Sequence, residues 1–216
     1  MCGRYAYRAS DFDYPGLFGT RPGEELADRY NIAPTQPVPV VRVAEDGSRE
    51  VTVVRWGLVP GWVKDPAALK LSLFNARAEG VAEKPSFRAA FRSRRCLVPV
   101  SGFYEWQKVD GAKQPWFIAR TDGRPAFFAG LWETWGPAEA RLESCTIITT
   151  GPNAEMGRLH HRMPVVLEED EFDVWLDHGP EEVLDTAPDG TFSLHRVSTR
   201  VNNARNQGAD LTLRID

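Results

Sequence analysis

The chain has 216 residues and a formal net charge of −4 at pH 7, with 42% hydrophobic and 26% charged residues. These values are typical of one globular domain with its own core, so we expect a single domain over residues 1–216 and exclude a disordered chain. No apolar run reaches the length of a membrane span, and the start of the chain lacks the apolar core of a signal peptide. The sequence therefore predicts a cytoplasmic protein with no membrane partner.

Short apolar or alternating runs predict strands. In chain order these are Val38–Val43, Val51–Trp56, Cys96–Val100, Trp116–Arg120, Ala126–Trp132, Cys145–Thr150, Pro164–Leu167 and Phe192–Val197. Helices are expected at Glu83–Arg92, at Asn153–Leu159 and at Glu168–Asp177, whose first carboxylates suit a helix N-terminus. Many strands, few helices and 16 prolines predict an α+β fold, a compact β-rich domain with a few peripheral helices.

Charged residues are unevenly distributed along the chain. Residues 168–185 contain nine acidic side chains and no Lys or Arg, whereas residues 84–95 contain five basic side chains and no acid. A basic face can bind phosphates even when the net charge is negative, because the local field matters more than the sum. Charge alone favours two solvated helix faces, so composition permits DNA binding without establishing it.

Three cysteines, Cys2, Cys96 and Cys145, form an odd set without CxxC spacing. This arrangement predicts free thiols and indicates neither a disulfide framework nor a zinc site. We therefore expect no metal and no cofactor.

Cys2 becomes the first residue when methionine aminopeptidase removes Met1, which it does when the second residue is small. The product carries an α-amine and a thiol on adjacent carbons, with reference pKa values of about 7.7–8.0 and about 8.5. An aldehyde forms an imine with this amine, and the thiolate then closes a five-membered thiazolidine ring, favoured by proximity. Position alone leaves the alternative that Cys2 is merely a small second residue.

Two further positions suit proton transfer. Glu105 follows the apolar run Val100–Tyr104 between aromatic residues, so partial burial is expected to raise its pKa into a useful range; a structural ion pair is the alternative. His160 and His161 are adjacent, and on an extended chain they point to opposite faces, so at most one faces a given site. A metal site there lacks a suitably spaced third ligand.

Other polar and aromatic side chains have shapes that suit nucleic acid. Asn75 and Arg77 share a face if the segment is extended, and an amide with a guanidinium can hold a sugar hydroxyl and a phosphate. Trp62, in a segment rich in Pro and Gly, can stack on an unpaired base. Loop packing is the alternative for all three.

Taken together, these residues resemble the SOS response-associated peptidase family, also known as abasic-site processing proteins. The matching stretches occur in the family's order and are Met1–Tyr5, Tyr30–Thr35, Trp56–Trp62, Asn75–Glu79, Arg95–Pro99, Gly102–Trp106, Ala129–Glu133, Thr149–Thr150 with Asn153, His160–Pro164 and Val201–Asn203. The resemblance implies the β-rich fold of this family. It also implies that Cys2 forms a thiazolidine crosslink with the ring-opened abasic site in single-stranded DNA, with lyase-type and possible autopeptidase activity.

The resemblance also implies roles for individual residues. Asn75 would orient the sugar and Cys2, Glu105 would move protons, and His160 would act on the sugar hydroxyl. DNA contacts would come from Arg4, Pro34, Trp62, Asn75, Arg77, Thr149 and Arg162. Val63 stands where some members carry a second tryptophan, which implies a differently built base-stacking wedge. We expect a monomer that associates with the nucleoid when bound to DNA.

Three functions remain open at this point: crosslinking at abasic sites, a thiol peptidase that uses Cys2, His160 and Glu105, and non-covalent binding of modified single-stranded DNA. Adduct chemistry best explains why the nucleophile stands at position 2, because an internal cysteine has no free amine.

Overall fold

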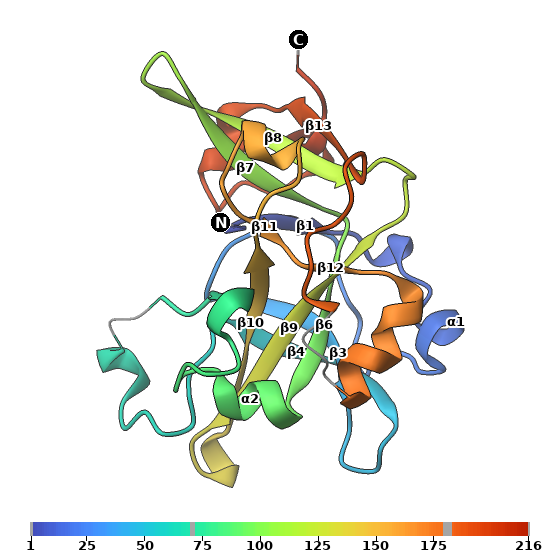
Figure 1. Ribbon diagram of the computed structural model, residues 1–216, viewed down its shortest axis with the longest axis vertical. Coiled ribbons are helices and arrows are strands. Elements are labelled where there is room, and N and C mark those ends of the chain that lie inside the picture. Colours follow the sequence, from blue (N-terminus) through green and yellow to red (C-terminus); the bar gives the residue numbers. More distant parts are fainter. Residues whose placement is uncertain (1, 70–71, 179–182, 216) are drawn as a thin grey trace.

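The computed structural model describes residues 2–69, 72–178 and 183–215 (Figure 1). Strands dominate it, and the helices are few and short, which confirms the predicted β-rich α+β fold. Among the described residues, no helix is long and apolar enough to cross a membrane.

Five strands of the described chain close into a barrel. They are β3 (Pro37–Val43), β4 (Arg49–Trp56), β6 (Arg95–Val100), β9 (Ala126–Trp135) and β10 (Leu142–Thr150). Each pairs with the next in the order β10-β4-β3-β6-β9, and β9 pairs back with β10; only β4 and β10 run parallel. Val38, Val40, Leu97, Val98 and Ile147 are fully buried, so these strands supply much of the core.

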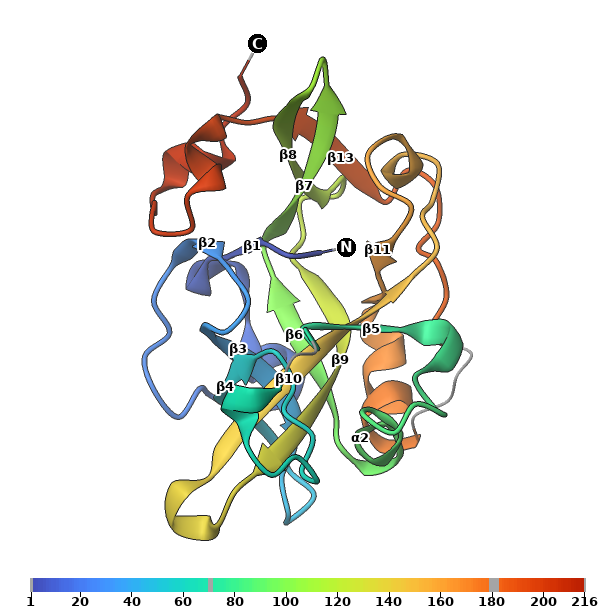
Figure 2. The same ribbon diagram turned by 90° about the vertical axis from the view of Figure 1, so that its left-hand side faces the viewer.

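A second sheet lies at one end of this barrel (Figures 1 and 2). In order across the sheet its strands are β13 (Phe192–Arg196), β8 (Ala112–Arg120), β7 (Gly102–Val109), β1 (Tyr5–Tyr7) and β2 (Arg29–Ile32). Every pairing in it is antiparallel.

Three short strands complete the barrel sheet. β5 (Asn75–Arg77) pairs parallel with β10, β11 (Met163–Pro164) pairs with β10, and β12 (Val166–Leu167) pairs with β9. The prediction of one strand over Pro164–Leu167 was therefore wrong. Val165 donates to Ile148 O while its own carbonyl accepts from Ala129 N, so the chain passes there from one barrel strand to the other.

The predicted helices are shorter than expected. α2 covers Arg88–Ser93 rather than Glu83–Arg92, because Pro85 disfavours the helical conformation of the residue before it. Glu168–Asp177 is a 3₁₀ turn at Glu169–Glu171 followed by a π-helical segment at Val174–His178. Asn153–Leu159 contains one 3₁₀ turn, Met156–Arg158, and α1 (Tyr14–Phe18) was not predicted.

The charged runs are more than solvated helix faces. Arg49 pairs with Asp173 and Asp177, and Arg124 pairs with Glu168 and Glu169, so part of the acidic run is neutralised internally. Glu181 and Glu182 of this run lie outside the described residues. In the basic run, Arg95 is buried and Arg94 pairs with Glu133, which leaves Lys84, Arg88 and Arg92 exposed.

Candidate functional site

Cys2 lies where the second sheet meets the barrel, directly before strand β1. Tyr5 is opposite Phe103, and the Tyr104 N–H donates to Arg4 O at 2.9 Å, so continuing this register brings the start of the chain alongside Glu105. The Asn75 side chain donates from Nδ2 to Cys2 O at 2.8 Å. Asn75 thus joins β5 of the barrel sheet to the backbone of Cys2.

The Cys2 thiol is fully buried. Burial, and secondly the negative charge of Glu105, raise the pKa of the Cys2 thiol well above its usual range. The thiolate is therefore disfavoured in this state, and a nearby proton acceptor is required before the sulfur can act as a nucleophile.

Glu105 lies within β7, opposite Trp116 of β8, and is 5% exposed. Burial raises the pKa of Glu105 to about 7, as the sequence predicted from its aromatic neighbours. The carboxyl group is therefore close to half protonated near neutral pH and can both accept and return a proton.

His160 lies in the loop that leads into β11. The Arg162 N–H donates to His160 Nδ1 at 3.0 Å, and Arg162 O lies 3.3 Å from the same nitrogen, so the Arg162 backbone engages Nδ1 in either tautomer of the ring. Burial lowers the pKa of His160, and the charge of Arg162 acts in the same direction, whereas the hydrogen bond with the Arg162 backbone raises the pKa by less. The neutral ring is therefore favoured, and the Arg162 backbone fixes its orientation through Nδ1.

His160 and His161 do not point to opposite faces, so that prediction was wrong. Their rings stack with centroids 4.3 Å apart. The chain bends at His161 instead of running extended, and the strict alternation of side chains that applies to a strand is lost.

Four of the predicted DNA ligands gather around β5 and β10. Asn75–Arg77 is extended, as assumed, and Arg77 is exposed. Thr149 is fully buried, its hydroxyl donates to Ala76 O at 3.2 Å, and its carbonyl accepts from Arg162. Arg162 also pairs with Glu79. Thr149 and Arg162 therefore build the wall behind Asn75 and Arg77 rather than the exposed surface.

Glu79 holds Arg162 in place, and the sequence predicted no role of its own for it. Its partner Arg162 is 83 positions away, so no local spacing could reveal the pair. The bond to Arg162 lowers the pKa of Glu79 and keeps it ionised.

Arg4 lies on the other side of Cys2 and is half-buried. Its Nη1 donates to Asn31 Oδ1 and to Val201 O, both at 2.7 Å, and its guanidinium lies 5.5 Å from the centroid of the Trp106 ring. Arg4 therefore fastens β1 to β2 and to the segment after β13.

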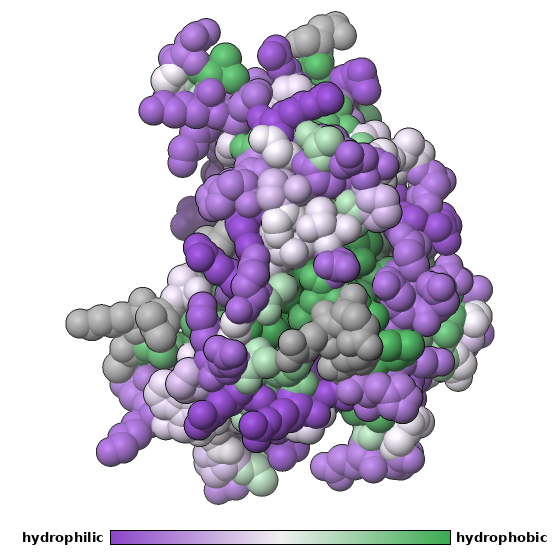
Figure 3. Space-filling view, in the orientation of Figure 1, coloured by the Kyte–Doolittle hydropathy of each residue, from purple (hydrophilic) through white to green (hydrophobic). Residues whose placement is uncertain are grey.

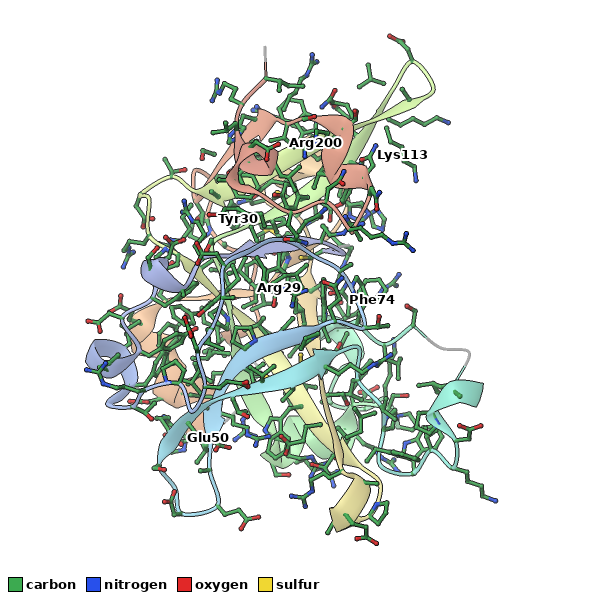
Figure 4. The ribbon with its side chains drawn as sticks, turned by 180° about the vertical axis from the view of Figure 1, so that it is seen from behind. Arg29, Tyr30, Glu50, Phe74, Lys113 and Arg200 are labelled. Carbon is green, nitrogen blue, oxygen red and sulfur yellow. The ribbon has the colours of Figure 1, made fainter. Side chains whose placement is uncertain are left out.

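Two further residues that the sequence singled out are Trp62, which is exposed, and Pro34, which lines a cavity of about 480 Å³. Trp62 is 62% exposed, with Nε1 3.4 Å from Pro85 O. Pro34 lines the cavity together with Arg55, Trp56 and Phe74, none of which the sequence singled out individually. Phe74 precedes Asn75 and lies at mid-height in Figure 4, between Lys113 of the second sheet and Glu50 of the barrel.

All three cysteines are free and buried. Among the residues for which the structure gives a position, no three His, Cys, Asp or Glu side chains form a group that could hold a metal ion.

Sequence comparison finds relatives over almost the whole chain. Residues 1–204 match the model of a family described as SOS response associated peptidase. The chain is 38% identical to abasic site processing protein YoaM of Bacillus subtilis, over 98% of this chain and 97% of that one. It is 31% identical to abasic site processing protein YedK of Escherichia coli, over 98% of both. Abasic site processing protein HMCES of Xenopus tropicalis is 33% identical over 82% of this chain and 63% of that protein.

Structure comparison finds the same fold in a crystal structure of a protein from Bacteroides thetaiotaomicron. The TM-score is 0.86 at 23% identity, over 99% of this chain and 100% of that chain.

Proposed function

The chain belongs to the SOS response associated peptidase family, and from this premise we propose that it processes abasic sites in DNA through a covalent bond to Cys2. Removal of Met1, which lies outside the described residues, exposes the α-amine of Cys2. The substrate is the ring-opened aldehyde of an abasic site in single-stranded DNA.

The chemistry proceeds in two steps and releases one water molecule. The α-amine attacks the aldehyde carbon, and loss of water from the carbinolamine leaves an imine. The Cys2 sulfur then gives up its proton and bonds to the imine carbon, and the nitrogen takes up a proton to complete the thiazolidine. Both steps move protons between sulfur, oxygen and nitrogen, so a group that titrates near neutral pH accelerates them.

The observation that carries this proposal is the position of Cys2 between Asn75 and Glu105. Asn75 holds the Cys2 backbone carbonyl, and the buried Glu105 has a pKa of about 7. A carboxyl group of this kind can take the proton from the amine or thiol and return it to the departing water. An ordinary exposed carboxylate is fully ionised at neutral pH and is a poor proton donor.

His160 acts on the abasic sugar in this proposal. In the tautomer whose Nδ1 accepts from the Arg162 N–H, the ring presents Nε2–H as a donor. A donor near the sugar ring oxygen favours the ring-opened aldehyde by hydrogen-bonding to the oxygen that leaves the aldehyde carbon.

The exposed Arg77 and Trp62 are the proposed direct contacts to DNA, through a phosphate and a base respectively. Asn75 would also contact the sugar, and Pro34 the kinked strand. Three of the predicted DNA contacts already bond to other protein groups through their side chains: Arg162, Thr149 and Arg4. We therefore propose that they mainly position their neighbours rather than bind a phosphate.

The test is a denaturing gel of the protein incubated with a single-stranded oligonucleotide that contains one abasic site. Wild type should give a shifted, heat-stable band, and Cys2→Ala should give none, whereas Cys145→Ala, which removes a buried thiol elsewhere, should retain the band. A chain with an uncleaved residue ahead of Cys2 should give no band, because its amine is blocked.

The alternatives give different results in the same assay. A thiol peptidase would release product from a peptide substrate without a DNA adduct, and a non-covalent binder would retain the oligonucleotide on a native gel even as Cys2→Ala. Equal band intensity with and without the blocking residue would overturn the thiazolidine mechanism.

A further inference from the structure

One face of the second sheet carries Glu105 and continues across two strands to an arginine. Glu105 of β7 is opposite Trp116 of β8, and Trp116 is opposite Arg196 of β13. Residues directly opposite each other in antiparallel strands point to the same face, so the three side chains form a row. With neighbouring strands about 4.8 Å apart, the backbone of Arg196 lies about 10 Å from that of Glu105.

The Arg196 side chain is exposed and held against Trp116. Its guanidinium lies 5.6 Å from the centroid of the Trp116 ring, within the range of a cation–π contact. In the part of the chain that the structure describes, Arg196 has no ion pair, whereas Arg120 of the adjacent strand β8 pairs with Asp122 and Glu168. The charge of Arg196 is therefore oriented and available to an external anion.

A second arginine approaches the same face from the loop that carries His160. Gln107 follows Glu105 by two residues and so shares its face, and its Nε2 donates to Arg158 O at 3.3 Å. This bond fastens the turn Met156–Arg158 to the sheet, and the loop that contains the turn lies beside β13 (Figure 2). The Arg158 side chain is exposed and, among described residues, has no acidic partner.

The acidic group of this loop is already occupied. Glu155 Oε1 accepts hydrogen bonds from Asn153, from Gly190 N and from Phe192 N. Its Oε1 is therefore bonded to the backbone at the start of β13, and neither arginine forms an ion pair with it. The surface at this end of the molecule is formed mainly by hydrophilic residues (Figure 3).

We propose that Arg158 and Arg196 form a basic strip that binds phosphates of the DNA strand as it leaves the abasic site past His160. This rests on the proposed function, because it assigns a path to the DNA that Cys2 would capture. A distance of about 10 Å corresponds to roughly three nucleotides at the stacked rise of about 3.4 Å. The strip therefore contacts the DNA strand beyond the reacting nucleotide. It raises the affinity for DNA and does not change the rate of the reaction at Cys2.

The test measures non-covalent binding of an intact single-stranded oligonucleotide as a function of salt. Each phosphate contact contributes about 0.7 to the slope of log K against log salt for a single strand. The double variant Arg158→Ala/Arg196→Ala should therefore show a slope smaller by about 1.4 than wild type. Arg141→Ala, an exposed arginine between β9 and β10 at the far end of the barrel, should keep the wild-type slope.

Crosslinking of abasic DNA provides the second readout. The double variant should require more DNA to reach half-maximal rate but should reach the same rate at saturation. An unchanged slope of log K against log salt in the double variant would overturn this proposal. A lower rate at saturation with an unchanged DNA concentration at half-maximal rate would overturn it as well. Since the first assay uses DNA without an abasic site, failure of wild type to form an adduct would contradict the proposed function and leave the result for the strip intact.

Discussion

At the level of single residues, Glu105 is a buried carboxyl group with a raised pKa. Its carboxyl group is 5% exposed and has a pKa of about 7, so at higher pH the folded protein must hold a buried negative charge beside Cys2. Such a charge is expensive to remove from water. Under the proposed function, this cost accompanies a carboxyl group that exchanges protons near neutral pH.

This perturbed pKa predicts a dependence of stability on pH. Because the folded-state pKa of Glu105 is raised above its unfolded value, its contribution to stability is fully present below about pH 4.5 and is lost as pH rises through about 7. Between pH 5 and pH 8, wild type should lose about 2 kcal/mol more unfolding free energy than Glu105→Gln, measured by urea denaturation. The control Glu139→Gln, in an exposed turn, should follow wild type; a Glu105→Gln curve parallel to wild type would contradict the assignment.

At the level of elements, Arg95 connects the ends of two helical segments. Its guanidinium donates to the carbonyls of Phe91 and Arg92 in α2 and to those of Trp175, Leu176 and Asp177 in the π-helical segment. The last carbonyls of a helix have no partner within the helix, so one buried cation satisfies both ends.

Replacing Arg95 should therefore be much more damaging than replacing its neighbour. Arg95→Met leaves several buried carbonyls without a donor, and we expect a loss of about 3 kcal/mol or more in unfolding free energy. Arg94 is partly exposed and has an ion pair with Glu133, so Arg94→Met should cost about 1 kcal/mol or less. The test is urea or thermal unfolding of both variants. An equal loss of unfolding free energy in the two would show that Arg95 contributes no more to stability than an exposed arginine.

Closure of the barrel depends on close contact between strands at the scale of the whole molecule. Gly130 of β9 lies opposite Cys96 of β6 and Ile147 of β10. A Cβ placed at Gly130 would lie 2.9 Å from Cys96 Sγ, 3.0 Å from Val98 Cγ2 and 3.1 Å from Thr146 O. A larger residue at this position would therefore force neighbouring strands apart.

Gly130→Ala should lower the unfolding free energy by about 1–3 kcal/mol through overpacking. Gly23→Ala is the matched control, because a Cβ there has nothing within 4 Å and its backbone is not left-handed. The control should be neutral or slightly stabilising, by up to about 1 kcal/mol. Urea unfolding of both variants tests this, and equal stability of the two would show that the barrel can expand at β9.

The sequence by itself determined most of the barrel and the candidate nucleophile. Val38–Val43, Cys96–Val100 and Ala126–Trp132 were predicted as strands, because buried strands are continuous apolar runs whose character does not depend on their partners. β1, β2 and β5 escaped prediction because three or four residues carry too little periodic signal. The proposed 1,2-aminothiol of Cys2 also required no structure, since it depends only on the second position and on removal of Met1.

Only the tertiary structure decided which groups surround that aminothiol. Asn75 reaches Cys2 across 73 positions, and Glu79 holds Arg162 across 83, through pairings that no local pattern specifies. The stacking of His160 on His161 and the row from Glu105 through Trp116 to Arg196 likewise depend on a bend and on strand register. Local physics sets which segments are strands, whereas contacts between distant segments set register and burial, and hence the pKa of Glu105 and the surroundings of Cys2.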